Sequence, residues 1–288
     1  MADSKPSFDE TPRAAVDLRL TGGGLAVPIE DDQLVLCTST DGLLGPEDRD
    51  PFFQRVLTVL ADSDVPYLVG GAYALERYTG IVRRTKDLDI FVRRHDCTAL
   101  LRVLEQAGYG TELTDARWIA KAFQADYFID IIFNSGNGIC PVDDAWFVYA
   151  RPDRVLGVPA RLCPPEETVW QKIFIMERER FDGADVAHLL RACGPSLDWE
   201  RLLARVGDHW MVLLAHLLLF RFTYPGDDRS VPEWVARQLL RKGALLEPQA
   251  ALDDLCRGTL LSRYQYVVDI ANWGYHDARL DAPPAEAA

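Results

Sequence analysis

The chain has 288 residues, of which 48% are hydrophobic and 26% are charged. These values are close to the average for globular proteins and exclude a fibrous or mostly disordered chain. With 31 Lys and Arg against 44 Asp and Glu, the net charge is -13, the opposite of the basic surface that DNA or long RNA favours. We therefore expect a folded protein, of one large domain or two modest ones, that does not bind DNA.

The cysteines and the apolar stretches indicate a cytoplasmic protein. The six cysteines include no Cys-x-x-Cys pair, which argues against a thiol zinc site or a disulfide framework. The first residues carry acids and prolines where an export signal needs a basic start and an apolar run. The most apolar stretch, residues 211–220, is well short of the roughly 20 residues that span a bilayer. We expect it to be a buried helix, and we expect no membrane partner.

The N-terminal part begins with a polar leader. Residues 1–25 are rich in Gly and Pro and are expected to be flexible, and the glycine run at 22–24 lacks the following Lys-Ser/Thr of a phosphate-binding loop. From Pro51 onward, apolar residues recur at helical spacing and predict a first helix. The short run 65–69 then reads as a strand, ended by Gly70-Gly71 and followed by a helix that stops at Gly80.

Further strands and one more helix are predicted in the middle of the chain. Residues 87–92 alternate between acidic and apolar and then become wholly apolar, as in a strand with one wet and one buried end. A helix with a glycine stop follows at 98–108, and runs at 118–123 and 127–133 predict a hairpin. A further edge hairpin is expected within 155–162.

Beyond Pro164-Pro165 the pattern becomes helical. Amphipathic stretches cover 166–181, 184–193, 198–206, 209–222 and 232–243. Because strands crowd the first half and helices the second, the sequence predicts the α+β class: an α+β domain over 26–163, a helical domain over 164–280 and a flexible tail over 281–288.

Two carboxylates stand out in the strand expected at 87–92. Alternation places Asp87 and Asp89 on one face, roughly 6–7 Å apart along the chain. Carboxylate oxygens at the open end of a strand are ligands that Mg²⁺ accepts together with phosphate oxygens and water. By itself an Asp-x-Asp is more often a solvated strand end, so other features must support a metal site.

Three further residues add to this pattern. Gly70 and Gly71 would let the backbone approach a ligand closely and open a helix whose N-terminal amides can hold phosphate oxygens, although a plain tight turn is the alternative. Asp130 lies among apolar strand residues, where a charge is costly unless it binds a metal or pairs with an arginine.

The order of these features resembles the DNA polymerase beta-like nucleotidyltransferase superfamily. The matching residues are Leu68-Val69-Gly70-Gly71, then Arg83-x-Thr85-x-Asp87-x-Asp89-Ile90, and Asp130 as a third carboxylate. The form with Arg-x-Thr before the acid pair is most similar to the small prokaryotic nucleotidyltransferases, among them antibiotic-modifying enzymes and abortive-infection toxins. The resemblance implies a mixed β-sheet with flanking helices, followed by a helical domain.

The resemblance also implies a site and its cofactors. Asp87, Asp89 and Asp130 would hold one or two Mg²⁺ ions, and an NTP, with ATP as the expected donor, would lie against Gly70, Gly71, Arg83, Thr85 and Lys172. Such proteins often carry a Lys and then an Arg-x-Asp-x-x-Asp pattern, here Lys172 and 180–185. We expect Lys172 and Arg180 on one helix, about 12 Å apart along its axis, approaching the triphosphate from one side. Arg83 or Arg84 could instead neutralise the acid cluster.

The implied function is metal-dependent transfer of a nucleoside monophosphate from an NTP to a hydroxyl group, with release of pyrophosphate. The acidic net charge favours a small-molecule acceptor. A toxin-like transferase acting on tRNA or on a protein is the second hypothesis, and Arg77, Arg83 and Arg84 would supply its local basic patch. The third is a non-catalytic member that binds a nucleotide or a partner protein. The histidines, His216 included, have no metal-binding spacing and are expected to be structural.

Overall fold

The computed structural model describes residues 20–21, 24–25, 46–83, 85–245 and 254–280. The chain divides into two compact units, Met1–Leu43 and Leu44–Ala288. In the first unit a short antiparallel pair is described, β1 (Leu20–Thr21) with β2 (Gly24–Leu25). The rest of the expected leader and the expected tail lie outside the described residues.

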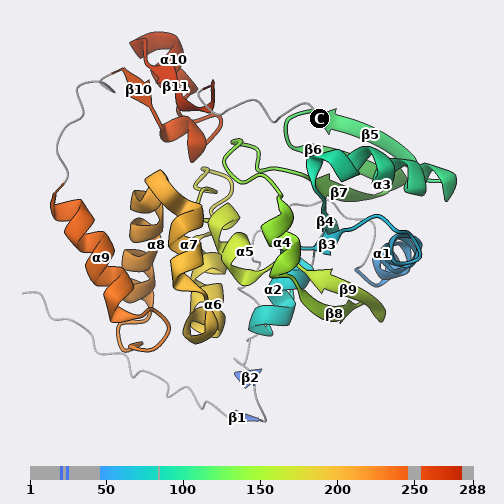
Figure 1. Cartoon of the computed structure of the whole chain (residues 1–288), viewed down its shortest axis with the longest axis horizontal. Coiled ribbons are helices and arrows are strands. Elements are labelled where there is room, and N and C mark those ends of the chain that lie inside the picture. Colours follow the sequence, from blue (N-terminus) through green and yellow to red (C-terminus); the bar gives the residue numbers. More distant parts are fainter. Residues whose placement is uncertain (1–19, 22–23, 26–45, 84, 246–253, 281–288) are drawn as a thin grey trace, which may run out of the picture. The chain divides into compact units, whose positions relative to one another are not determined.

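A mixed seven-stranded sheet is the centre of the second unit (Figure 1). Its order is β5-β6-β7-β4-β3-β9-β8, in which the pairs β4/β7 and β3/β9 are parallel and the others antiparallel. The strands are β3 (Leu68–Val69), β4 (Asp89–Phe91), β5 (Gly110–Asp115), β6 (Ile119–Gln124), β7 (Tyr127–Ile132), β8 (Arg151–Val155) and β9 (Val158–Leu162). This sheet, with its flanking helices, confirms the predicted α+β class.

Helices pack beside the sheet and beyond it. They are α1 (Pro46–Ala61), α2 (Gly71–Thr79), α3 (Arg94–Gln106), α4 (Asp144–Val148), α5 (Pro165–Lys172), α6 (Gly183–Cys193), α7 (Trp199–Val206), α8 (Trp210–Thr223), α9 (Glu233–Ala244) and α10 (Val267–Trp273). Figure 1 shows α1 and α3 beside the strands and α6 to α9 gathered at the other end. One hydrophobic core joins α1 and α3 to the sheet, and a second joins the other side of the sheet to α5 through α9.

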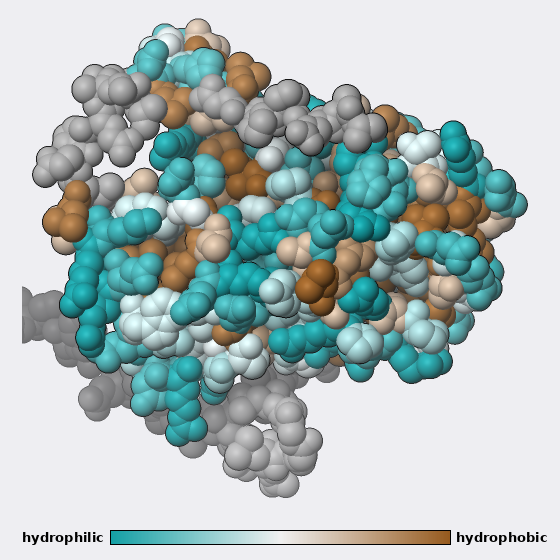
Figure 2. Space-filling view, in the orientation of Figure 1, coloured by the Kyte–Doolittle hydropathy of each residue, from teal (hydrophilic) through white to brown (hydrophobic). Residues whose placement is uncertain are grey.

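The central strands are short and buried because they carry apolar residues on both faces. Leu68, Val69 and Ile90 are fully buried, whereas Asp89 at the start of β4 is only half-buried. As the sequence predicted, one end of β4 reaches the interior and the other remains open to solvent. Hydrophilic side chains cover much of the face shown in Figure 2, in keeping with the charged fraction of the chain.

Five charged residues join α5, α7 and the start of α4, and we call them the α5–α7 ion network. Arg201 contacts both Glu166 and Glu167. Arg205 lies 3.3 Å from Glu167 and 2.6 Å from Asp143, whose side chain also caps α4 by accepting from the Ala145 amide. Glu167 is fully buried, and burial raises the pKa of its carboxyl despite the nearby arginines. The network therefore links α5 and α7 to each other and to the start of α4 through paired charges.

Several predicted elements are confirmed, and others differ. Strands β6 and β7 form the predicted hairpin, and β8 and β9 form the edge hairpin, although residues 156–157 are its turn rather than strand. The helix predicted over 166–181 is wrong in its second half, because α5 ends at Lys172. Residues 173–182 instead form a loop closed by a bridge between Met176 and Phe181. Strand β5 and helix α4 were not predicted, and no individual element was predicted within 254–280, which the sequence analysis included in the helical domain.

The segment 254–280 adds short elements at the C-terminal end. They are β10 (Leu255–Cys256), paired in parallel with β11 (His276–Asp277), and helix α10. The described residues from Leu44 onward belong to one compact unit, so the domain boundary expected near residue 163 stays a prediction.

One helical run among the described residues, Trp199–Thr223, is long and apolar enough by length and composition to cross a membrane. Core helices of folded proteins meet the same criteria, so the run is weak evidence for a membrane. The 3-10 turn Gly207–His209 divides it, and α8 buries Leu213, His216, Leu217 and Phe220. The part predicted to be a buried helix is thus a helix buried along one side.

Candidate active site

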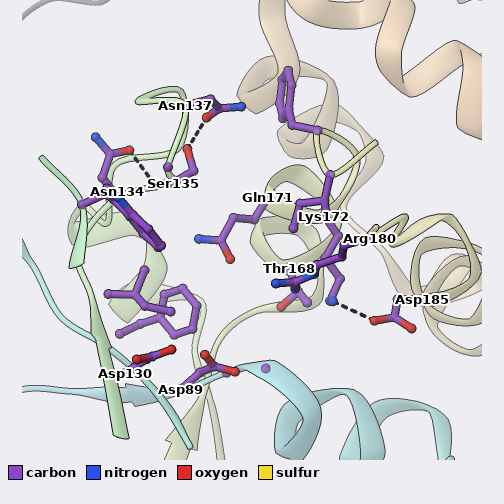
Figure 3. Close-up of a pocket in the computed structure, with 18 of the residues that line it drawn as sticks. Asp89, Asp130, Asn134, Ser135, Asn137, Thr168, Gln171, Lys172, Arg180 and Asp185 are labelled. Carbon is purple, nitrogen blue, oxygen red and sulfur yellow. Dashed lines mark hydrogen bonds and ion pairs between the residues drawn. The ribbon is translucent and has the colours of Figure 1, made fainter. Parts of the chain in front are cut away.

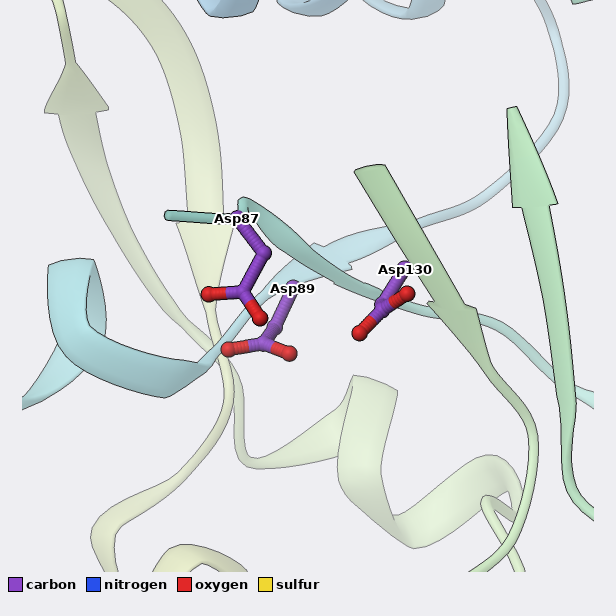
Figure 4. A group of neighbouring side chains, drawn as sticks. All are labelled: Asp87, Asp89 and Asp130. Atoms are coloured by element: carbon purple, nitrogen blue, oxygen red, sulfur yellow. The ribbon is translucent and has the colours of Figure 1, made fainter. Parts of the chain in front are cut away.

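Three carboxylates from two separate stretches of chain converge at the open end of β4. Asp89, the first residue of β4, is directly opposite Asp130 in the parallel pairing with β7. Asp87 precedes the strand, and one oxygen from each of the three side chains lies within 4.8 Å of the others (Figure 4). We call Asp87, Asp89 and Asp130 the acid triad. The parallel register explains why side chains so distant in sequence meet.

The electrostatics of the triad suit a bound cation. The pKa of Asp89 is raised to about 7, first because its carboxyl is buried and then because Asp87 and Asp130 repel its charge. Burial also raises the pKa of Asp130, against the opposing effect of Lys121. A divalent cation with a preference for oxygen ligands would remove this repulsion, so the donor set fits Mg²⁺.

Two members of the triad have a protein partner that helps to hold them. Lys121 Nζ lies 2.6 Å from Asp130 Oδ1, and the two residues are opposite each other in the β6–β7 hairpin. The Thr85 hydroxyl donates to Asp87 Oδ1 at 2.7 Å. Asp130 is therefore paired with a lysine rather than with the arginine considered as the alternative. Each of these carboxylates has a second oxygen for another ligand.

The Gly70-Gly71 pair allows the backbone to approach Asp89. The Gly70 amide donates to the Asp89 carbonyl at 3.0 Å. Gly71 has a φ of +56°, and a Cβ at this position would lie 1.6 Å from Asp89 Oδ2. Only glycine fits there, because any side chain would displace the carboxylate. The N-terminus of α2 thus lies directly against the acid triad.

Three positively charged side chains, Arg83, Lys172 and Arg180, line the same pocket as the triad, and we call them the cation cluster. Lys172 Nζ lies 2.6 Å from Asp182 and 2.7 Å from Asp185, Arg180 lies 3.0 Å from Asp182, and Arg83 contacts Asp185. Lys172 and Arg180 also lower the pKa of Asp89, which partly offsets its carboxylate neighbours. Arg83 pairs with Asp185 and not with the triad.

The expected geometry of Lys172 and Arg180 is wrong, because they do not share a helix. Lys172 ends α5, and Arg180 follows in the loop before α6. The backbone of the loop is held by hydrogen bonds from Glu177 to Arg180 and from Asp182 to Ile175. The loop brings the two cations together through Asp182, which both contact.

The nine residues that the sequence predicted to bind the metal or the NTP line one pocket of about 530 Å³ (Figure 3). They are Gly70, Gly71, Arg83, Thr85, Asp87, Asp89, Asp130, Lys172 and Arg180. Their individual roles stay predictions. The pocket combines a triad of carboxylates with nearby cations, which is an arrangement able to bind a metal ion and a polyphosphate together.

Other lining residues were missed by the sequence analysis. Gln171 precedes Lys172 on α5, and residues 134–137 form the turn after β7. Thr259, Leu260, Leu261, Arg263, Tyr264 and Arg279 reach the pocket from the C-terminal segment. The isolated polar residues among them gave no periodic signal.

The basic patch expected from Arg77 and Arg83 is largely neutralised. Arg77 donates two hydrogen bonds to Asp153, and Arg83 contacts Asp185. Residue 84 lies outside the described residues. His216, as predicted, is a core residue, with Nε2 at 2.9 Å from the Ile173 carbonyl.

With this geometry established, comparison with known proteins identifies the class. Residues 53–221 match the model of a family described as uncharacterised nucleotidyltransferases. Because the match covers more than half of the chain, the protein belongs to this family, and the predicted resemblance is confirmed. No curated protein matches the chain.

Solved structures of similar proteins include nucleotidyltransferases. The antibiotic-resistance factor ANT(2'')-Ia is 17% identical, with 60% of this chain and 99% of that chain covered and a TM-score of 0.41. JHP933 from Helicobacter pylori is 14% identical, with 69% and 95% covered and a TM-score of 0.36. A nucleotidyltransferase-like protein from Paracoccidioides brasiliensis is 13% identical, with 61% and 94% covered and a TM-score of 0.36.

Proposed function

We propose that this nucleotidyltransferase moves a nucleoside monophosphate from an NTP, with ATP as the expected donor, to a hydroxyl group of a small molecule and releases pyrophosphate. Asp87, Asp89 and Asp130 would hold Mg²⁺. The observation that carries the proposal is the convergence of these three carboxylates in a pocket that also contains the cation cluster. A cytoplasmic location is part of the same expectation.

Each part of the pocket has a task in this reaction. Arg83, Lys172 and Arg180 would bind the phosphate oxygens of the NTP, and the amides at the start of α2 would add to this. Asp182 and Asp185 would keep the cations in place. Their carboxylate oxygens lie within 3.1 Å of the side-chain nitrogens of Lys172, and those of Asp182 lie equally close to Arg180. These contacts are made before any nucleotide arrives.

The chemical step is an in-line displacement at the α-phosphorus. The acceptor oxygen forms a bond to this phosphorus as the bond to the bridging oxygen of pyrophosphate breaks. Asp130 would accept the proton of the acceptor hydroxyl, with Lys121 holding the carboxylate in position. A divalent cation bound by the triad supplies charge neutralisation and Lewis-acid polarisation of the phosphate oxygens.

The experiment is to incubate the protein with each labelled NTP, Mg²⁺ and a cell extract, and to separate small molecules, RNA and protein. We expect label in the small-molecule fraction with the wild type and none with Asp87→Asn. The matched control is Asp126→Asn, at an exposed carboxylate on the β6–β7 turn, which should keep full activity. Both variants should melt near the temperature of the wild type.

Three results would contradict the proposal. Full activity of Asp87→Asn would refute the metal site. Label in RNA or protein instead of small molecules would support the toxin-like hypothesis. Binding of NTP without release of pyrophosphate would support a non-catalytic member of the family.

A further inference from the structure

The walls of the active-site pocket differ in their chemistry. On one side of the acid triad lies the cation cluster, whose lysine and arginines are already held by Asp182 and Asp185. A second side of the pocket is lined by the turn at 134–137 and by the C-terminal segment, which contacts both this turn and the loop before α6. Figure 3 shows the turn residues facing Lys172 and Arg180 across the pocket, with Gln171 between them. We call the second side the C-terminal wall.

The C-terminal wall is built into the fold rather than loosely attached. Asn137 Nδ2 donates to the Leu260 carbonyl at 2.8 Å, and the Met176 amide donates to the Leu261 carbonyl at 3.2 Å. Thr259, Leu260 and Ser262 are buried. These contacts place the next two residues, Arg263 and Tyr264, at the pocket. The segment lies outside the region, 53–221, that matches the family.

Arg263 is the charged group on this wall that has no ion-pair partner among the described residues. Among the described residues no carboxylate lies within ion-pair distance of its guanidinium, which contacts the Tyr264 ring with Cζ 5.8 Å from the centroid. The pKa of Asp115 is lowered to about 2, mainly by the hydrogen bond from Arg117 and only slightly by Arg263. Arg279, in contrast, is bound to Asp277.

The other polar groups near Arg263 are uncharged. The turn at 134–137 and the residues 259–264 contain no acid. Asn137 uses its amide within the fold, whereas Gln171 has an amide without a hydrogen-bond partner among the described residues. The lining carboxylates outside the triad are Asp185, which Lys172 and Arg83 hold, and Glu177 on the loop before α6.

We propose that the C-terminal wall selects an acceptor that carries an anionic group, a carboxylate or a phosphate, besides its reactive hydroxyl. Arg263 binds the anion, and Gln171 binds an uncharged polar group nearer the triad. A guanidinium suits either anion because its N–H groups match two acceptor oxygens at once. A polycationic acceptor is disfavoured because this wall offers it an unpaired positive charge. This inference rests on the proposed transferase activity.

The test uses the full-length protein with labelled ATP and Mg²⁺. Small molecules of a cell extract are first divided on an anion-exchange column into a retained and an unretained pool. We expect label transfer to the retained pool. The two anions are distinguished by treating this pool with a phosphatase, which is removed before ATP and the protein are added. Labelling is then lost for a phosphate acceptor and kept for a carboxylate acceptor.

Arg263→Gln should raise the amount of retained pool needed for half-maximal labelling about 10-fold, because a charge-assisted hydrogen bond is lost. Arg263→Glu should raise it further. The control is Arg257→Gln, at an exposed arginine of the same segment that does not line the pocket, and it should behave as the wild type. Calorimetry should give the same affinity for Mg-ATP in all four proteins.

Label in the unretained pool, or an Arg263→Gln protein that labels as well as the wild type, would overturn the acceptor class. So would ATP binding without label in either pool. A wild-type protein that does not bind Mg-ATP would instead overturn the proposed function, so the two failures are distinguishable.

Discussion

The acid triad and the α5–α7 ion network are both clusters of partly or fully buried charges, and they differ in how the charges are balanced. In the network every carboxylate contacts an arginine, and Arg201 and Arg205 each contact two of them. In the triad three carboxylates share one lysine contact, at Asp130. Paired charges hold elements together, whereas an unbalanced group retains the capacity to bind a cation. The following predictions test this distinction, from the largest expected effect to the smallest.

Arg201→Met should show the structural role of the network. The substitution leaves Glu166 and Glu167 buried without their main partner, and we expect the free energy of unfolding to fall by about 3–5 kcal/mol. Denaturant unfolding measures this. The control is Arg237→Met, which removes an exposed ion pair with Glu233 on α9 and should cost at most about 0.5 kcal/mol. Equal losses in the two variants would show that the network adds nothing beyond a surface pair.

Asp89→Asn should have the opposite consequence for stability. It removes one of three like charges, so the melting temperature without metal should stay the same or rise. Label transfer should fall about 1000-fold, because several kcal/mol of metal-assisted stabilisation of the transition state are lost. Thermal melts with and without Mg²⁺ provide a second readout. The ion should raise the melting temperature of the wild type and not of the variant. If the variant melts well below the wild type without metal, the Asp89 carboxylate stabilises the fold, as the carboxylates of the α5–α7 ion network do.

Gly71→Ala and Gly80→Ala separate backbone strain from crowding of the triad. Both glycines have positive φ, 56° and 73°, so the backbone strain alone should cost each alanine variant about 1–2 kcal/mol of stability, and the collision with Asp89 should add to this cost in Gly71→Ala. A Cβ at Gly80 meets nothing within 4 Å, whereas one at Gly71 collides with Asp89. We therefore expect a large loss of transfer activity in Gly71→Ala and none in Gly80→Ala. Similar activities would show that the position of the Asp89 carboxylate does not matter.

The smallest expected effect is a change in the pH dependence of stability when His216 is replaced. Burial lowers the pKa of its imidazole in the folded protein, despite the hydrogen bond to Ile173 and the charge of Asp182. The unfolded chain therefore binds the proton more readily, and stability falls as the pH drops below about 6.5. His216→Gln should reduce this acid sensitivity, measured as denaturant midpoints between pH 5 and 8. A His216→Gln protein whose denaturant midpoints keep the full acid sensitivity of the wild type would contradict the assignment.

The three residues of the acid triad could be selected from the sequence because each is a charge within a pattern of apolar residues. Asp87 and Asp89 alternate with apolar residues, and Asp130 is a charge inside an apolar strand. Their convergence came from the resemblance to a known superfamily, since the parallel β4–β7 pairing joins residues far apart in the chain. The close approach of Asp89 to Gly71 likewise depends on tertiary geometry that no local pattern encodes.

The errors have physical causes of their own. Residues 166–181 have apolar residues at helical spacing, yet α5 ends at Lys172 because tertiary contacts bind the next residues differently: the Ile173 carbonyl meets His216, and Met176 bonds to Leu261. The C-terminal segment is made of elements of two to seven residues, too short for periodicity to be visible. Its contribution to the pocket could be found only from the structure.

The register of Asp89 with Asp130 has a consequence for how the protein acquires its activity. During synthesis, β4 leaves the ribosome well before β7, and the first two carboxylates then have no third companion. Pairing of these strands requires closure of the intervening helix and hairpin, a slow kind of event in folding. Under the proposed function the newly made chain is inert until its sheet has closed, and we expect the recovery of nucleotide transfer during refolding to follow that closure.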